Sequence, residues 1–406
     1  MKRIFLSILA SFIGFYTFAQ VDNNVTIGKI DSLQSKALGE QRKIWVYVPS
    51  GGSSQQKYPV VYLLDGDAHF YSVVGIIQQL SQVNGNTICP EMIVVGIPNT
   101  DRTRDLTPTH VDVDPPFMDS AFSKTSGGGE QFISFIEKEL IPHIDSLYPT
   151  QSYKMLIGHS FGGLAVINTV VNHTKLFNSY ICIEPSMWWD KMNYLKATKK
   201  ALSEKNFSGT TLYLGIANTM EEGMDITKVQ SDTSVATRHI RSILELDKHI
   251  KSQKQNGLRY ESKYYNNDDH SSVPIIAEYD ALRFIFDRFR FKLSFKDFTD
   301  SSAALANKFK RHYEEVSKMF GYKVPPPENI VNSMAYEFLG QKQYTKAGSL
   351  FKMNVDNYPG SYNVFDSYGD YFVAIGDKQK AIENFKKALS LKEIPESRQK
   401  LNKLLE

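Results

Sequence analysis

The sequence predicts an α/β protein with a mostly parallel, doubly wound sheet, followed by a smaller all-α domain at the C-terminal end. From about residue 25 to about residue 290, short runs of β-branched and aromatic residues alternate with longer amphipathic stretches, as in a parallel sheet covered by helices. The middle runs are almost continuously apolar, which is typical of strands buried on both faces. After about residue 295 the pattern is almost entirely helical.

The first residues, MKRIFLSILASFIGFYTFAQ, combine a basic start, an apolar stretch and small residues at Thr17 and Ala19. This layout is typical of a secretory signal peptide, so we expect residues 1–19 to be removed and the mature protein to be secreted or periplasmic. The alternative is an uncleaved membrane anchor, although the apolar stretch is short for a bilayer span. After removal of the signal peptide we expect no membrane span.

The charge and cysteine content exclude several classes of function. The chain has 406 residues with 47 Lys and Arg against 44 Asp and Glu, and this near-neutrality argues against nucleic acid as a partner. Two cysteines do not make a disulfide scaffold, although one bridge is permitted in an oxidising compartment. Neither a CxxC nor an HExxH motif occurs, so we expect no metal and no cofactor.

The strands and helices of the first domain, residues 20–295, can be read in order. The clearest helix is EQFISFIEKELIPHIDSLY at 130–148, whose apolar residues recur at helical spacing on one face. The expected strands are RKIWVYVP at 42–49, YPVVYLLDG at 58–66, EMIVVGIPN at 91–99, YKMLIG at 153–158, SYICIEP at 179–185 and TLYLGIAN at 211–218.

The segment LIGHSFGGL at 156–164 carries the candidate nucleophile, Ser160. The pattern G-x-S-x-G is weak alone, but here a strand-like run enters it and a helix-like run leaves it, which is the context of a nucleophile elbow. Glycines at 158 and 162 suit such a turn, because side chains there would collide with neighbouring backbone. We therefore expect Ser160 to attack the substrate.

A serine nucleophile needs a base, and in this arrangement the histidine comes last along the chain. His270, in YYNNDDHSSVP, has the expected place, whereas we expect His159 to have a packing role. The acid should follow a strand between the two, and TMEEGMD after TLYLGIAN offers Glu222, which we favour over Glu221, with Asp225 third.

The oxyanion of the tetrahedral intermediate needs two N–H donors. One should be the backbone N–H of Phe161, directly after the nucleophile, and the other should come from the loop after an earlier strand. LLDGDAHF at 63–70 supplies such a loop, and Asp67 is the expected donor with Gly66 as the alternative.

The C-terminal part, residues 296–406, contains two segments that align at a spacing of 34 residues, with Ala347 matching Ala381 and Phe351 matching Phe385. This period resembles that of tetratricopeptide repeats, and it predicts two repeats at about 329–362 and 363–396. Because the preceding linker is not rich in Gly or Ser, we expect a fixed docking. Such repeats commonly bind proteins, so a protein partner is a further expectation.

Taken in order, YLLDGD, VVGIPNTDRTRDLTP, GHSFGG, EPSMWWD and DHSSVP resemble the putative-esterase family of α/β-hydrolases, over roughly residues 25–290. The resemblance implies an α/β-hydrolase fold and a serine esterase. NTDRTRDLTP and EPSMWWD most resemble the siderophore-esterase branch, whose members cleave the ester bonds of a catecholate trilactone. Other members of the family are feruloyl and acetylxylan esterases.

The resemblance also implies substrate-binding residues. Arg102 and Arg104 match an arginine-bearing stretch near the substrate mouth of that branch, where their guanidinium groups would suit an anionic substrate. The alternative is that they form surface salt bridges with Asp101 or Asp105. Trp188 and its neighbour at 189 would form an aromatic wall, with one of the two expected to belong to the core.

These observations predict a secreted serine carboxylic-ester hydrolase that works through an acyl-enzyme, on a siderophore-type catecholate trilactone. The first alternative is a feruloyl or acetyl esterase acting on polysaccharide-linked esters. The alternative from another class is a non-catalytic binding or scaffold protein that uses the helical repeats. The expected partner of the catalytic domain is thus a small-molecule or oligosaccharide ester.

Overall fold

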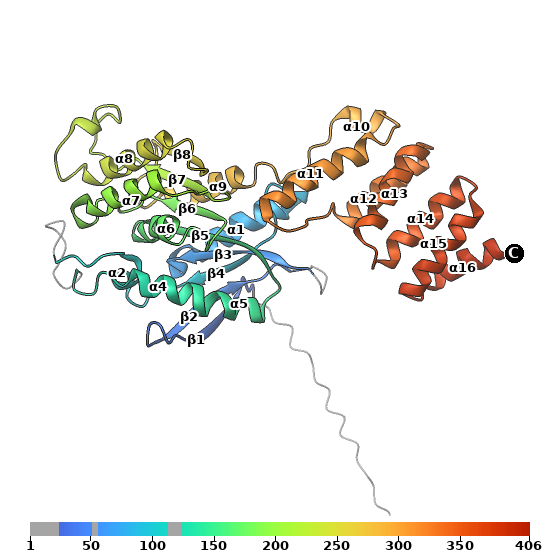
Figure 1. The fold of residues 1–406 in the computed structure, drawn as a ribbon, viewed down its shortest axis with the longest axis horizontal. Coiled ribbons are helices and arrows are strands. Elements are labelled where there is room, and N and C mark those ends of the chain that lie inside the picture. Colours follow the sequence, from blue (N-terminus) through green and yellow to red (C-terminus); the bar gives the residue numbers. More distant parts are fainter. Residues whose placement is uncertain (1–23, 51–55, 113–122) are drawn as a thin grey trace, which may run out of the picture.

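The computed structural model describes residues 24–50, 56–112 and 123–406. Within these residues eight strands form one sheet in the order β1-β2-β4-β3-β5-β6-β7-β8 (Figure 1). Strands β3 to β8 run parallel, whereas β2 pairs antiparallel with both β1 and β4. The strands are β1 (Lys29–Gln34), β2 (Gln41–Tyr47), β3 (Tyr58–Leu64), β4 (Ile93–Ile97), β5 (Thr150–His159), β6 (Ser179–Ile183), β7 (Thr211–Ala217) and β8 (Arg259–Tyr265).

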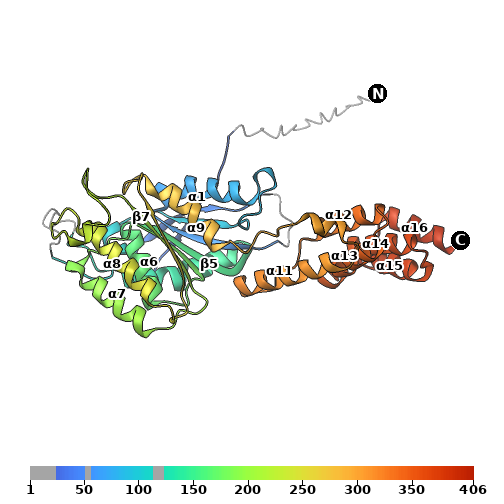
Figure 2. The ribbon, with the colours of Figure 1, turned by 90° about the horizontal axis from the view of Figure 1, so that it is seen from above.

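Helices cover both faces of the sheet, which confirms the predicted α/β-hydrolase fold with a helical C-terminal region. Helices α1 and α9 lie on one face, and α4 to α8 lie on the other (Figure 2). A π-helical turn at Ile136–Leu140 joins α4 to α5, so the long helix predicted at 130–148 is present. The helices of this part are α1 (Gly66–Ser81), α2 (Arg102–Leu106), α4 (Gly129–Phe135), α5 (Ile141–Leu147), α6 (Phe161–Asn172), α7 (Asn193–Glu204), α8 (Arg238–Ser252) and α9 (Val273–Ile285).

The central strands are buried because their side chains point alternately to two hydrophobic cores. Every residue of β3, β4 and β6 is buried. In β3, Val60 and Tyr62 belong to the core under α4 to α8, whereas Val61 and Leu63 belong to the core under α1 and α9. The apolar runs of the sequence are therefore continuous because both faces of these strands are buried.

Helix α11 belongs to two cores at once. Its C-terminal residues Val316 and Phe320 pack into the core under α1 and α9, and Phe320 lies 5.0 Å from the ring of Tyr153 at the start of β5. Its N-terminal residues Leu305 and Phe309 pack into the core of the helical region. Helix α11 thus joins the helical region to the sheet by packing against both. That the chain divides into two domains at 295/296 stays a prediction.

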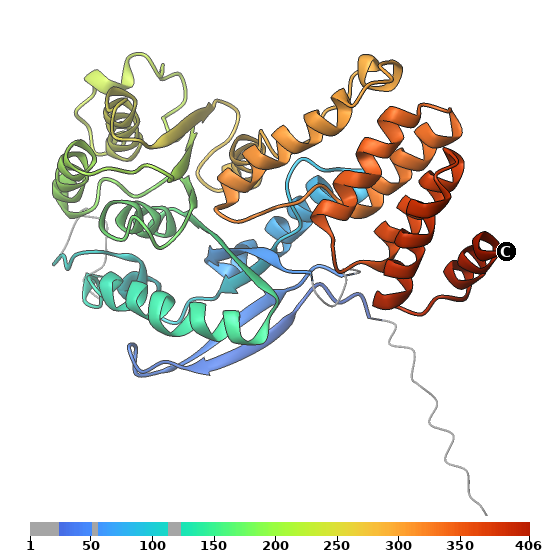
Figure 3. The same cartoon turned by 45° about the vertical axis from the view of Figure 1, so that its right-hand side comes forward.

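The helical region is built from antiparallel helix pairs (Figure 3). The residues that align at a spacing of 34 occupy equivalent buried positions: Ala347 and Ala381 are fully buried, as are Phe351 and Phe385. The tetratricopeptide resemblance itself stays a prediction. The helices are α10 (Phe295–Thr299), α11 (Ala304–Phe320), α12 (Glu328–Gly340), α13 (Tyr344–Asn357), α14 (Tyr362–Ala374), α15 (Lys378–Leu391) and α16 (Pro395–Leu405).

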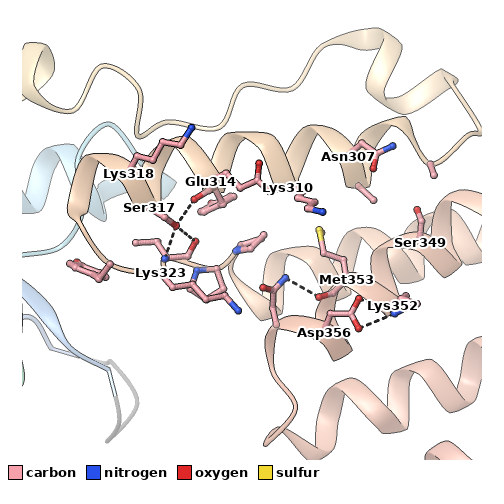
Figure 4. Close-up of a pocket in the computed structure, with 18 of the residues that line it drawn as sticks. Asn307, Lys310, Glu314, Ser317, Lys318, Lys323, Ser349, Lys352, Met353 and Asp356 are labelled. Atoms are coloured by element: carbon pink, nitrogen blue, oxygen red, sulfur yellow. Dashed lines mark hydrogen bonds and ion pairs between the residues drawn. The ribbon is translucent and has the colours of Figure 1, made fainter.

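A cavity of about 1210 Å³ lies between α11, the segment that follows it and α13. Figure 4 shows Lys310 of α11, Lys323 of the following segment and Asp356 of α13 around it. All of its lining residues lie between Ala303 and Tyr368.

Two predictions about the chain as a whole can be compared with the described residues. None of the helices in 24–50, 56–112 and 123–406 is long and apolar enough to cross a membrane. The predicted signal peptide, residues 1–19, lies outside the described part. Cys89 and Cys182 are free and buried, so they do not form the disulfide that an oxidising compartment would permit.

Candidate active site

Ser160 lies on the turn between β5 and α6. Its backbone has φ 59° and ψ −114°, a conformation that costs a residue other than glycine about 1–3 kcal/mol. The Ser160 N–H donates to the carbonyl of Ile183 at 3.0 Å. The Ser160 carbonyl in turn accepts from the N–H groups of Leu164 at 2.9 Å and Ser186 at 3.1 Å. The strained turn is therefore held by backbone hydrogen bonds on both sides.

Close packing against backbone requires glycine at 158, as predicted, and at 163, whereas a Cβ at Gly162 would meet side chains, the nearest atom being Oδ2 of Asp65 at 3.0 Å. A Cβ at Gly158 would lie 2.3 Å from the carbonyl oxygen of Gly162, and a Cβ at Gly163 would lie 2.9 Å from the carbonyl oxygen of Ile183. Both distances are shorter than a carbon can approach backbone. The sequence context of the elbow, strand then sharp turn then helix, is thus present in the fold.

His270 lies in the loop between β8 and α9, beside the elbow. Its ring centroid is 4.5 Å from that of His159, the residue directly before Ser160. The loop is anchored by the N–H of Asn218, which donates to the carbonyl of Asp268 at 2.8 Å, and by Asp269, whose carboxylate accepts from two backbone N–H groups that follow it. His270 is 37% exposed, so a substrate can reach it.

Glu184 is the carboxylate that contacts His270, and sequence reasoning missed it. It follows β6, is fully buried, and has a φ of 46°. Its Oε2 lies 3.3 Å from Nδ1 of His270 and 2.9 Å from Nε2 of His239. Its Oε1 accepts the N–H of Ala217 at 2.6 Å. Because an ionised carboxylate only accepts, both imidazoles donate to it.

The structure does not agree with the prediction that Glu222 is the acid. Glu222 and Glu221 are exposed on the turn after β7, and the carboxylate of Asp225 accepts hydrogen bonds from Thr227. The prediction assumed that the acid follows β7, whereas the carboxylate beside His270 follows the neighbouring strand β6. The signal was present in EPSMWWD: a glutamate directly after a fully apolar strand is buried, and a buried carboxylate needs hydrogen-bond donors.

Glu184 is ionised in this environment. Burial opposes ionisation, but the hydrogen bonds from His239, His270 and the Ala217 N–H outweigh it and hold its pKa at about 2. The site therefore contains a buried negative charge directly behind His270.

Four histidine rings line the site in a row. The ring centroids of His69 and His159 are 5.7 Å apart, and those of His270 and His239 are 5.1 Å apart. Burial, followed by the charges of His270 and His69, lowers the pKa of His159 to about 3. His159 is therefore neutral and packs against the face of His270.

The second expected oxyanion loop lies against the elbow. A Cβ at Gly162 would lie 3.0 Å from Oδ2 of Asp65, which directly precedes α1. Ala68 and His69 donate to the carbonyl of Asp65, which leaves the N–H groups of Gly66 and Asp67 at the open N-terminal end of α1. Phe161 is the first residue of α6, as Gly66 is the first residue of α1.

Arg102 lies at this site, paired with a residue that sequence reasoning did not name. Its Nε donates to Oδ1 of Asp65 at 2.6 Å and its Nη2 to Oδ2 at 3.0 Å, while the guanidinium also lies over the ring of Phe161. A further bond runs from Nη2 to the carbonyl of His159 at 3.3 Å. Arg102 is 35% exposed, so one face of it remains open to a ligand.

Arg104 belongs to a different cluster. Its Nε donates to Asp105 at 2.7 Å and its Nη2 donates to Glu40 at 2.8 Å, and the buried Arg42 bonds to the same two carboxylates. The hydrogen bond from Arg104 is the main cause that lowers the pKa of Glu40 to about 2. For Arg104 the expected substrate contact is thus replaced by the alternative, a salt bridge with Asp105.

The two tryptophans have different environments. Trp189 is fully buried and its Nε1 donates to Oγ1 of Thr109 at 3.0 Å, so it is the core member of the pair. Trp188 is partly exposed and lies 6.0 Å, between ring centroids, from Phe161. Trp188 and Arg102 thus form a partly exposed aromatic and cationic rim beside Ser160, and both contact the buried ring of Phe161.

Glu184, His239 and His270 are also residue types that bind transition metals, and their ligand atoms lie within 4.8 Å of one another. No motif in the sequence indicates a metal site. The same atoms are joined by hydrogen bonds, which account for their proximity without an ion.

The chain is similar in sequence to a known protein family and to several named proteins. The sequence model of the Esterase family, described as "Putative esterase", matches residues 35–271. The ferri-bacillibactin esterase BesA of Bacillus subtilis is 28% identical over 64% of this chain and 91% of its own length. A siderophore enterobactin esterase of Emericella nidulans is also 28% identical, over 38% of this chain and 54% of its own length.

Solved structures extend the likeness beyond the catalytic part. An IroE-like serine hydrolase from Shewanella oneidensis is 30% identical with a TM-score of 0.68, covering 80% of this chain and 98% of that one. A protein from Capnocytophaga ochracea, 19% identical with a TM-score of 0.61, covers 93% of this chain and 99% of that one. The second likeness concerns the fold alone.

Proposed function

Since the chain belongs to the Esterase family and is a carboxylic ester hydrolase, we propose that it is a secreted serine esterase that cleaves siderophore esters through an acyl-enzyme. The observation that carries the mechanism is the buried Glu184 carboxylate against Nδ1 of His270, directly beside the elbow that bears Ser160. A buried acid, an oriented imidazole and a serine on a strained turn are the components of a catalytic triad.

The reaction follows from the two nitrogens of His270. Nδ1 donates to Glu184, so Nε2 is free to accept the proton of the Ser160 hydroxyl as Oγ attacks the ester carbonyl. His270 then gives that proton to the leaving alcohol, and an acyl-enzyme remains. Water attacks the acyl-enzyme with His270 again as the base, which releases the acid and restores Ser160. Glu184 stays ionised and stabilises the imidazolium at each step.

The developing oxyanion needs donors that are already in place. We assign this role to the backbone N–H groups of Phe161 and Asp67, with Gly66 as the alternative to Asp67. The contact between the Asp65 turn and Gly162 supports the assignment, because it brings the N-terminal ends of α1 and α6 together.

Two observations support a siderophore substrate. The relatives BesA and the Emericella nidulans protein are named as siderophore esterases. The rim beside Ser160 combines the partly exposed guanidinium of Arg102 with the partly exposed ring of Trp188, a combination that suits an anionic aromatic acyl group such as a catecholate. A feruloyl group is also aromatic, so the experiment below includes it.

Two parts of the proposal concern the rest of the chain. Residues 1–19 have the layout of a signal peptide, which supports a secreted or periplasmic protein. The 34-residue period of the helical region, which resembles that of repeats that bind proteins, supports a protein partner separate from the ester substrate.

The test uses protein beginning at residue 20, compared with its Ser160→Ala variant. Both are incubated with a ferric catecholate trilactone and with feruloylated and acetylated oligosaccharides, and the products are followed by mass spectrometry. We expect serine-dependent opening of the trilactone. Release of ferulate or acetate alone would replace the siderophore by a polysaccharide ester. Turnover that survives in the Ser160→Ala variant would refute the serine mechanism.

A further inference from the structure

On the basis of the proposed function, we infer that His239 is a positioning residue of the catalytic site. It holds the Glu184 carboxylate in the orientation that His270 requires. Sequence patterns assign His239 only to a helical stretch, and in the structure it lies in the first turn of α8.

The carboxylate is shared unequally between the two histidines. The same oxygen, Oε2 of Glu184, lies 2.9 Å from Nε2 of His239 and 3.3 Å from Nδ1 of His270. The shorter of the two bonds is the one to His239. Together with the Ala217 N–H on Oε1, His239 therefore fixes both oxygens of Glu184 before His270 makes its contact.

The environment of His239 leaves one place for its proton. Nδ1 of His239 is buried and has no hydrogen-bond partner, whereas Nε2 faces a carboxylate that can only accept. A proton on Nδ1 would leave a donor unsatisfied and face a lone pair of Nε2 toward the negative charge. The Nε2–H tautomer is thus strongly favoured, and it donates to Glu184.

His239 also contacts the imidazole of His270 directly. The two rings meet edge to face, with centroids 5.1 Å apart and planes at 78°, while His159 lies 4.5 Å from His270. The neutral His159 and the fixed His239 therefore limit the rotation of His270. His239 acts on the catalytic imidazole both through the carboxylate and through ring packing.

A fully buried carboxylate makes this arrangement sensitive to loss of one donor. Glu184 has no exposed surface, so water cannot simply replace a deleted imidazole at its oxygen without opening the site. In a His239→Ala variant the carboxylate is free to turn toward the space left by the ring, and His270 follows it. Misplacement of a catalytic group by about 1 Å can cost about 100-fold in rate.

The experiment measures kcat and KM for the protein beginning at residue 20 and for three variants of it, on the ester that the function test identifies. We expect His239→Ala to lower kcat about 10- to 100-fold with KM nearly unchanged, because His239 positions the base and does not bind substrate. His239→Gln should recover most of the loss, since its amide can donate to the same oxygen. His249→Ala is the matched control: it removes another α8 histidine, whose Nε2 bonds to the Lys199 carbonyl, and should leave kcat unchanged.

Other outcomes would overturn the inference. An unchanged kcat in His239→Ala, or a glutamine variant as slow as the alanine variant while equally stable to heat, would show that His239 does not act through a hydrogen bond to Glu184. Loss of wild-type activity on treatment with a chelator, restored by a divalent transition metal, would show that the three side chains hold an ion instead. Failure of the proposed function can be distinguished from failure of this inference, because in that case the Ser160→Ala variant would remain active.

Discussion

The buried Glu184 carboxylate determines how His270 is oriented in this site. Its charge is compensated by three donors within one small region, and two of these donors are imidazoles. An unpaired carboxylate at the same depth would be protonated and could not orient a base. The identity of the acid is therefore a matter of burial and partners, which a single sequence does not display.

The role of Glu184 as the acid can be tested by replacing this side chain. Glu184→Gln should lower kcat about 10³- to 10⁴-fold, because the neutral amide no longer stabilises the imidazolium or fixes its tautomer. Glu222→Gln, the matched change at an exposed position, should leave kcat unchanged. Steady-state kinetics with each purified variant measures both. A larger loss in Glu222→Gln than in Glu184→Gln would reverse the assignment of the acid.

The residues that sequence analysis identified differ in how local their signals are. Ser160 has a local signal, since the strand, the glycines and the helix are adjacent in the chain. His270 was suggested by chain order and lies beside the elbow, as its 4.5 Å ring contact with His159 indicates. Glu184 and His239 are 55 positions apart and meet only through the fold, so neither spacing nor motif could pair them.

At the scale of elements, β1 and β3 show why some strands are easily predicted. β3 is apolar throughout and buried on both faces, so its residues stand out in the sequence. β1, with the sequence KIDSLQ, lies at the edge of the sheet and is mostly exposed. It carries no apolar run, and the sequence analysis did not predict it.

Helices α1 and α9 support the site from one face of the sheet. Between them lies a buried acid, Glu278, whose carboxyl has no basic partner among the described residues. Glu278 of α9 is 2% exposed, and its Oε2 has no hydrogen-bond partner. Burial, only partly offset by Ser72 of α1, raises its pKa to about 8. Because α1 begins at the oxyanion loop and α9 follows His270, the packing of these helices matters to the site.

This acid predicts how stability depends on pH. Below pH 4.5 Glu278 is protonated in both the folded and the unfolded chain, so its ionisation does not lower the free energy of unfolding. Between pH 4.5 and 8 only the unfolded chain ionises, and the free energy of unfolding falls by about 1.4 kcal/mol per pH unit. Glu278→Gln removes this loss, so the variant should be more stable than wild type on the order of 3 kcal/mol at pH 7.

Urea unfolding at pH 5 and pH 8, followed by fluorescence, measures the difference. The gain from Glu278→Gln should be small at pH 5 and large at pH 8. An equal gain at both pH values would mean that the acid is ionised or paired in the folded protein.

At the scale of the whole molecule, the catalytic site and the helical region lie at opposite ends of β5. Ser160 follows the last residue of β5, whereas Phe320 of α11 packs on Tyr153 near its start. Phe320 is also stacked on Phe286, with planes at 20°. The helical region therefore closes the core under α1 and α9, near the end of β5 that is opposite to Ser160.

Removal of the helical region should consequently destabilise the esterase part. A chain that ends at residue 295 exposes Tyr153 and Phe286, and loss of one buried Phe contact of this size costs about 3–5 kcal/mol. A chain that ends at residue 360 keeps α11 in place and is the control. Urea unfolding followed by tryptophan fluorescence should show a loss of stability for the first truncation only. Equal stability of the 295 truncation and the full-length protein would contradict the shared core.

The central claim is that Ser160 is a nucleophile activated by His270 and Glu184. The most direct measurement is intact-protein and peptide mass spectrometry after reaction with an active-site-directed phosphonate, for wild type and Ser160→Ala. We expect one adduct, located on the peptide that contains Ser160 and absent from the variant. An adduct on another residue, or none on a folded wild-type protein, would contradict it.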